Sequence, residues 1–187
     1  MIEKDIRAVI VSSLFPGYLI EDIATTGATI RTLRAGSGPP LLLLHGYPQT
    51  HVIWHRIAGR LAERFTVVLT DLRGYGDSSK PEGGSRHQNY SFRAMAQDQL
   101  EVMRSLGHEC FYVASHDRGA RTAHRLCLDH PEAVRKVCFM DIVPTLRMYR
   151  DTSMEFATKY MWWFFLIQNA PLPEHMIKVG LGAHRAL

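Results

Sequence analysis

An apolar run passes directly into polar, glycine-containing sequence at Phe111-Tyr112-Val113-Ala114-Ser115-His116-Asp117-Arg118-Gly119-Ala120-Arg121. The apolar half predicts a buried strand, and the residues after it have the spacing of a helix that Pro131 ends. Small residues, Ser115 and Gly119, flank Asp117 and permit a sharp strand-to-helix turn. Such a turn pushes the residue at its apex out of the sheet, so we expect Asp117 to face a ligand.

The alternation of short apolar runs and helical segments continues on both sides of this turn. It predicts strands at 41–44, 66–70 and 134–140, and helices near 54–61 and 92–106, the second ended by Gly107. Strands that alternate with helices form right-handed βαβ units. The sequence therefore predicts an α/β fold, with a mostly parallel sheet and helices on both faces.

Composition excludes several classes of protein. The chain has 187 residues, of which 46% are hydrophobic and 21% charged, as in ordinary globular proteins. Its longest apolar runs, Leu41–Leu44 and Trp162–Ile167, are far short of the roughly 20 residues that span a bilayer. The N-terminal residues have no secretory pattern, so we expect no membrane association and a cytoplasmic location. The net charge of +4 is spread along the chain, which argues against nucleic acid as a partner.

Cysteine and histidine spacing indicates neither a disulfide nor a metal site. Cys110, Cys127 and Cys138 form no CxxC motif and lie in apolar segments, so they are expected to be buried thiols. Histidines and carboxylates show no metal-ligand spacing. We therefore expect no metal and no cofactor.

Three predicted strand ends carry residues suited to chemistry, and ligands of open α/β sheets bind beyond such ends. They are His45-Gly46-Tyr47-Pro48, Asp117 and Asp141. At a helix N-terminus the dipole keeps Asp117 ionised and therefore nucleophilic. Arg118 and Arg121 lie three residues apart on the first helical turn, so both can face one pocket.

The order of these motifs is similar to that of a known family. The segments are His45-Gly46-Tyr47-Pro48-Gln49-Thr50-His51 with Trp54-His55, Asp71-Leu72-Arg73-Gly74-Tyr75-Gly76-Asp77-Ser78, His116-Asp117-Arg118-Gly119-Ala120-Arg121, Asp141-Ile142-Val143-Pro144-Thr145 and Ala170-Pro171-Leu172-Pro173-Glu174. Over residues 15–174 they resemble α/β hydrolases of the haloacetate (fluoroacetate) dehalogenase type. The resemblance implies an α/β-hydrolase core at 1–145, and the beginning of a helical cap with an atypical tail at 146–187. It also implies that the C-terminal part of the fold is missing.

The resemblance also implies an activity, which is hydrolytic removal of halide from a short 2-haloacid. Asp117 would attack the carbon that bears the halogen and form an ester. Arg118 and Arg121 would clamp the substrate carboxylate, for which a guanidinium is suited. The backbone N–H groups of Tyr47 and Arg118 would form the oxyanion hole.

The remaining positions of the resemblance include two departures. Asp141 would be the acid that orients a histidine base, yet only His175 and His184 follow it, and neither has the sequence context of that base. Trp163 would donate to the departing halide. Trp162 stands where the family typically has a histidine that also holds the halide, which disfavours fluoride relative to chloride or bromide. We therefore expect an impaired enzyme that stops after one turnover.

Two other interpretations stay open. An epoxide hydrolase also uses an aspartate nucleophile, but it usually has tryptophan where this chain has Arg118. Alternatively, the chain is a truncated, catalytically inactive α/β-hydrolase fragment. Its sheet would then expose an unpaired edge, which favours aggregation or a homodimer.

Overall fold

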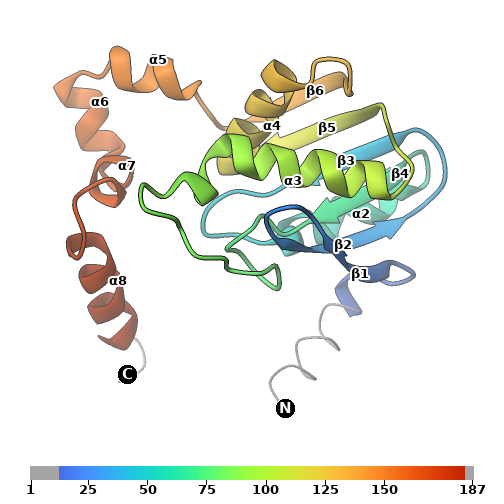
Figure 1. The fold of residues 1–187 in the computed structure, drawn as a ribbon, viewed down its shortest axis with the longest axis horizontal. Coiled ribbons are helices and arrows are strands. Elements are labelled where there is room, and N and C mark those ends of the chain that lie inside the picture. The colour runs from blue at the N-terminus through green and yellow to red at the C-terminus, as the bar shows by residue number, and fades with distance from the viewer. Residues whose placement is uncertain (1–12, 184–187) are drawn as a thin grey trace. The chain divides into compact units, whose positions relative to one another are not determined.

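The structure is a computed structural model that describes residues 13–183. The chain divides between Pro144 and Thr145 into two compact units, which are described separately. Within the described range, the first unit carries the whole sheet and the second consists of helices and their connections (Figure 1).

In the described residues, a six-stranded sheet with the order β1-β2-β4-β3-β5-β6 forms the centre of the first unit. The strands are β1 (Leu19–Ala24), β2 (Thr29–Ala35), β3 (Pro40–Leu44), β4 (Thr66–Thr70), β5 (Phe111–His116) and β6 (Val134–Met140). The strands from β3 to β6 pair in parallel, whereas β2 is antiparallel to both β1 and β4. The four strands predicted from apolar runs are confirmed, and so is the mostly parallel α/β sheet.

Helices cover the sheet on both faces, as expected (Figure 1). They are the 3-10 helix η1 (His51–Trp54), α2 (His55–Ala62), the 3-10 helix η2 (Gln88–Tyr90), α3 (Phe92–Ser105) and α4 (Arg118–Asp129). Strand β3 explains why both faces need cover. Leu41 and Leu43 lie in the core that contains Ala58 of α2, whereas Leu42 and Leu44 lie in the core formed with α3 and α4. A central parallel strand is therefore apolar along its whole length.

The β1–β2 hairpin was not predicted, because its residues form no continuous apolar run. Its exposed faces carry cross-strand ion pairs, in which Arg31 Nε lies 2.7 Å from Asp22 Oδ1 and Arg34 Nε lies 2.7 Å from Glu21 Oε1. Charged side chains that alternate with apolar ones are typical of a strand near a sheet edge. The signal was present in the alternation of 19–24 and 29–35 around the turn at 25–28.

The β5–β6 end of the sheet is less covered than the sequence predicts. Helix α4 packs on one face of these strands, while an open groove of about 380 Å³ lies on the other. Its lining includes Leu41, Phe65, Tyr112, Lys136 and Cys138.

The expectation that the three cysteines are buried thiols is wrong. Cys138 is exposed, and Cys110 and Cys127 are half-buried. Cys138 is exposed because β6 pairs only with β5 in the described part of the chain, so this strand lies at the edge of the sheet.

Within residues 145–183 the second unit consists of short helices. Its helices are α5 (Thr145–Arg150), α6 (Met154–Lys159), α7 (Met161–Leu166) and α8 (Leu172–Ala183). Ser153 ends the apolar periodicity, because its hydroxyl caps α6 by accepting from the N–H of Phe156. None of the described helices is long and apolar enough to cross a membrane.

Candidate active site

Asp117 stands at the junction of β5 and α4, where the sequence predicts a sharp turn. Its backbone has φ 50° and ψ −118°, a strained conformation that L-residues rarely adopt. The backbone N–H of Asp117 donates to the carbonyl of Met140 at 3.1 Å, and its carbonyl accepts from the N–H groups of Ala120 and Arg121. The strained residue is therefore fixed both by the neighbouring strand and by the first turn of the helix.

Two glycines allow the surrounding backbone to approach this turn. A Cβ atom at Gly119 would lie 2.4 Å from the carbonyl oxygen of His45 and 2.7 Å from that of Leu44. A Cβ at Gly46 would lie 2.5 Å from Oδ1 of Asp117. The end of β3 is thus pressed against the base of α4, and only glycine fits at either position.

The Asp117 carboxylate accepts a hydrogen bond from the backbone of the loop after β3. The N–H of Tyr47 donates to Asp117 Oδ1 at 2.8 Å. Gln49 holds this loop, since its Oε1 accepts from the N–H of Gly46 at 3.0 Å and lies 3.0 Å from Nδ1 of His116. One carboxylate oxygen is therefore paired with a backbone donor, an arrangement that suits stabilisation of negative charge.

Two arginines follow Asp117 on α4. The guanidinium carbon of Arg118 lies 5.1 Å from the centre of the Phe92 ring, a cation–π contact. Its buried Nε finds no hydrogen-bond acceptor among residues 13–183. The Arg121 side chain is also buried, with 4% of the residue exposed. A half-buried arginine and a buried one directly after Asp117 favour an anionic ligand there.

His45 lies close to Asp117 in the fold, but it does not have the environment of a base. Its Nδ1 lies 2.8 Å from the carbonyl of Gly46, and its Nε2 accepts from the N–H of Leu72 at 3.0 Å. Burial lowers the pKa of the imidazole. A neutral ring with both nitrogens occupied serves to join the loops after β3 and β4.

Asp71, to which the sequence analysis assigned no role, supports the same region. Its Oδ1 accepts from the backbone N–H of His51 at 2.7 Å and lies 2.8 Å from that residue's Nδ1, and its Oδ2 accepts from the N–H of Asp77. Burial alone would raise the pKa of Asp71, but these hydrogen bonds and His51 lower it. Asp71 is therefore a buried carboxylate that shapes the loop, and its position directly after a buried strand was the available signal.

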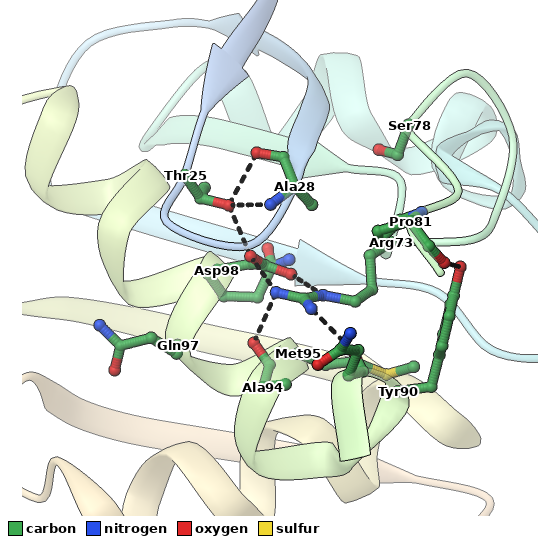
Figure 2. Close-up of polar contacts among 12 residues, drawn as sticks. Thr25, Ala28, Arg73, Ser78, Pro81, Tyr90, Ala94, Met95, Gln97 and Asp98 are labelled. Atoms are coloured by element: carbon green, nitrogen blue, oxygen red, sulfur yellow. Dashed lines mark hydrogen bonds and ion pairs between the residues drawn. The ribbon is translucent and has the colours of Figure 1, made fainter. Parts of the chain in front are cut away.

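A second buried charge, Arg73, ties the loop after β4 to α3, as Figure 2 shows. Arg73 donates through Nε and Nη2 to both carboxylate oxygens of Asp98 on α3, at 2.6 and 2.7 Å, and through Nη1 to the carbonyl of Asn89. Thr25, in the turn between β1 and β2, donates to Asp98 at 2.6 Å. Three segments distant in sequence are held together by this ion pair.

Asp141 lies at the end of β6, next to the strand that leads to Asp117. It has φ 54°, and 82% of its side chain is exposed. Its Oδ2 lies 3.6 Å from Nε2 of His116, on the neighbouring strand β5. The role of Asp141 as the acid of a triad stays a prediction.

The predicted halide donor, Trp163, and its neighbour Trp162 lie in the second unit, on α7. Trp162 is 61% exposed and packs edge-on against Phe165, whereas Trp163 is half-buried. Of the two histidines that follow Asp141, His175 lies on α8 and His184 lies outside the described residues. Residues 13–183 contain no cluster of three or more His, Cys, Asp or Glu side chains suited to a metal.

A comparison with protein-family models matches residues 39–177 to the α/β hydrolase fold. The chain belongs to the α/β-hydrolase fold family. It is 50% identical over 164 residues to a fluoroacetate dehalogenase from a Burkholderia species, across 88% of this chain and 54% of the relative. It thus spans about half the length of that relative.

Two further relatives place the chain more broadly in the family. A solved structure of a putative α/β hydrolase from Nostoc sp PCC 7120 is 59% identical and superposes with a TM-score of 0.88, over 91% of this chain and 58% of that one. A soluble epoxide hydrolase from Corynebacterium sp. (strain C12) is 39% identical over 64% of this chain and 40% of its own length. The similarity to a dehalogenase bears out the family resemblance stated from the motifs.

Proposed function

We propose that this chain carries out the chemistry of a haloacetate dehalogenase in the cytoplasm, with Asp117 as the nucleophile. The observation that carries the proposal is the hydrogen bond of 2.8 Å from the Tyr47 N–H to Asp117 Oδ1, at a strained turn followed by the half-buried Arg118 and the buried Arg121. The 50% identity to a fluoroacetate dehalogenase supports the same activity.

In the proposed first step, Asp117 Oδ2 attacks the carbon that bears the halogen. A carbon–oxygen bond forms, the carbon–halogen bond breaks, and the halide leaves with the bonding electron pair. Arg118 and Arg121 hold the substrate carboxylate and align the molecule for this displacement. Trp163 is the proposed donor to the halide, and Trp162 is proposed only as a neighbouring substrate-binding residue.

In the proposed second step, water attacks the carbonyl carbon of the ester, the bond between that carbon and Oδ2 breaks, and the substrate carbon leaves with Oδ2 as a 2-hydroxy acid. During the attack, negative charge develops on Oδ1, which the N–H groups of Tyr47 and Arg118 stabilise. Arg118 begins α4, where helical geometry leaves the first N–H groups without an internal acceptor. A histidine oriented by Asp141 would remove the proton from water. Because no histidine of this chain has the context of that base, we expect the ester to accumulate after one turnover.

Incubation of the chain with bromoacetate tests the proposal. Peptide mapping is expected to locate one carboxymethyl group on Asp117 as an ester that hydroxylamine removes, distinct from the stable thioethers that bromoacetate forms on the three free cysteines. Asp117→Asn should abolish this adduct, while Asp22→Asn, a surface substitution in the β1–β2 hairpin, should leave it unchanged. Sustained bromide release over many equivalents would contradict the single turnover, and absence of the adduct would contradict the activity.

The 39% identity to a soluble epoxide hydrolase favours one alternative. An epoxide would also form an ester with Asp117, but it has no carboxylate for Arg118 and Arg121 to bind. Labelling by a small epoxide at a higher rate than by bromoacetate would favour this second activity.

The homodimer is proposed from the edge strand β6, which pairs only with β5 in residues 13–183. Light scattering of the purified chain tests it, since a monomeric mass would exclude the homodimer.

A further inference from the structure

The segments that follow β3 and β5 leave the sheet side by side. The two strands pair in parallel, with Leu44 opposite Ser115 in the register. Gly46 therefore lies beside Asp117, so closely that a Cβ atom on Gly46 would lie 2.4 Å from the Cβ of Asp117. Because this position must be glycine, its backbone has more rotational freedom than that of any other residue. Other contacts must remove that freedom if Tyr47 is to keep its N–H at Asp117.

Gln49 holds the Gly46 backbone on both of its sides. The backbone N–H of Gln49 donates to the carbonyl of Gly46 at 2.9 Å, and its side-chain Oε1 accepts from the Gly46 N–H at 3.0 Å. The Gly46 carbonyl and the Tyr47 N–H belong to one planar peptide group, in which they point in opposite directions. Contacts that fix the Gly46 backbone therefore also direct the Tyr47 N–H toward Asp117 Oδ1, which lies 2.8 Å away.

The same Oε1 atom joins this loop to the strand that leads to Asp117. Nδ1 of His116, on β5, lies 3.0 Å from Gln49 Oε1. Since the Gly46 N–H can only donate, the Gln49 atom that faces it is the amide oxygen rather than the amide nitrogen. His116 then carries a proton on Nδ1 and donates it to that oxygen. Gln49 Oε1 thus bridges the loop after β3 and the residue immediately before Asp117.

The charge on Asp117 Oδ1 changes in opposite directions in the two proposed steps. While the ester forms, the carboxylate loses its negative charge, so a hydrogen bond to Oδ1 does not favour this step. When a nucleophile attacks the ester carbonyl, negative charge grows on Oδ1, and the Tyr47 N–H stabilises that charge. A residue that only positions the Tyr47 N–H should therefore affect breakdown of the ester more than its formation.

We propose that Gln49 is a positioning residue, which holds the Tyr47 N–H at Asp117 by bridging Gly46 and His116 through one carbonyl oxygen. The inference rests on the proposed function and adds to it a residue that controls the second step. It assigns no contact with the substrate to Gln49.

The test follows breakdown of the ester at Asp117 by hydroxylamine, a reaction that needs no histidine base. Protein treated with bromoacetate is separated from excess reagent and then exposed to hydroxylamine. The hydroxylamine nitrogen attacks the ester carbonyl and the bond to Oδ2 breaks. Glycolate leaves with the proton that the nitrogen loses, and Asp117 becomes a hydroxamate. Peptide mapping over time gives the rate of ester removal, while thioethers on the three cysteines stay unchanged. The same reaction in urea gives the rate for the unfolded chain.

Gln49→Leu removes the acceptor at similar size. We expect ester removal in the folded protein to be about tenfold slower and ester formation to change less than about twofold. Removal of an oxyanion donor itself costs about a hundredfold or more, but here the Tyr47 N–H stays in the loop. Gln49→Glu keeps an oxygen that accepts from both donors, so it should restore ester removal to within about threefold of the wild type. In urea all variants should react at one rate.

His116→Phe tests the other end of the bridge. It keeps a planar ring and removes the Nδ1 donor, while the contact between Gln49 and Gly46 remains, so ester removal should slow about threefold. This variant also tests the bridge if Gln49→Leu does not fold.

Gln88→Leu is the matched control. The Gln88 Oε1 also accepts from a backbone N–H, that of Arg86 at 3.0 Å, but it does so at the start of η2. Gln88→Leu should leave both rates unchanged.

Gln49→Leu that loses the ester at the wild-type rate, or that slows formation and removal equally, would overturn the inference and leave the proposed function standing. Gln49→Glu that is as slow as Gln49→Leu would do the same. Failure of the wild-type protein to form any ester at Asp117 would refute the proposed function, and the inference with it.

Discussion

Substitution of Gly119 by alanine tests the close approach on which the geometry of Asp117 depends. The added Cβ would lie 2.4 Å and 2.7 Å from the carbonyl oxygens of His45 and Leu44. Both atoms belong to backbone at the end of a central strand, so neither can move aside as a flexible side chain would. Overpacking of this kind costs about 1–3 kcal/mol, and here the upper end applies.

Alanine also favours a helix over glycine by up to about 1 kcal/mol, which offsets part of that cost. The net expectation for Gly119→Ala is a loss of about 2 kcal/mol in the free energy of unfolding. With a urea m-value of about 2 kcal/mol/M, the midpoint should fall by about 1 M. Urea unfolding followed by circular dichroism measures this shift.

Gly59→Ala provides the matched control, because Gly59 lies in the middle of α2 with nothing within 4 Å of its Cβ position. It should gain about 0.5–1 kcal/mol and unfold at slightly higher urea. Gly119→Ala with the midpoint of the wild type, or an equal loss for Gly59→Ala, would refute the close approach as the cause.

Three further outcomes are expected. Asp98→Asn leaves the buried Arg73 cation without a carboxylate and should cost about 3 kcal/mol in urea unfolding, and a cost below about 1 kcal/mol would mean that the pair contributes little. Burial lowers the pKa of His45, so at mildly acidic pH the unfolded chain binds a proton that the folded chain does not. The free energy of unfolding should therefore fall as the pH drops below about 6.5, and less steeply in His45→Gln. Gly46→Ala should displace the Asp117 carboxylate and slow its reaction with bromoacetate at least tenfold, roughly the effect of one lost oxyanion contact. An unchanged rate would contradict that displacement.

Much of the central fold was predictable because burial on both faces leaves a continuous apolar run. Strands β3, β4 and β5 carry that signal, whereas β6 contains Arg135 and Lys136 and has no buried residue; the breakers after the strands mark their ends. The β1–β2 hairpin was missed because one of its faces carries charges, which hide the strand in a search for apolar runs. The division of the second unit into short helices was not predicted, since Ser153 caps a new helix within an otherwise helical pattern.

The position of the candidate site could be predicted from the sequence, but the contacts between its residues could not. The spacing around Asp117 indicates a turn, yet only the structure shows that the Tyr47 N–H reaches its carboxylate. Phe92 was not predicted as a neighbour of Arg118, because contacts between segments distant in sequence leave no local pattern. The contribution of the second unit, including Trp162 and Trp163, stays a prediction.

The register of strand β3 in the sheet affects both the core and the candidate site. Its four leucines alternate between two separate cores, and the strand leads directly to the loop that meets Asp117. Deleting one residue from 41–44 would exchange the sides of the sheet to which these leucines point. The same slip would retract Tyr47 by one strand residue, about 3.3 Å. A chain that mispairs here would therefore lose both the packing of its two cores and the hydrogen bond from Tyr47 to Asp117. Packing of the core and assembly of the candidate site thus require the same register.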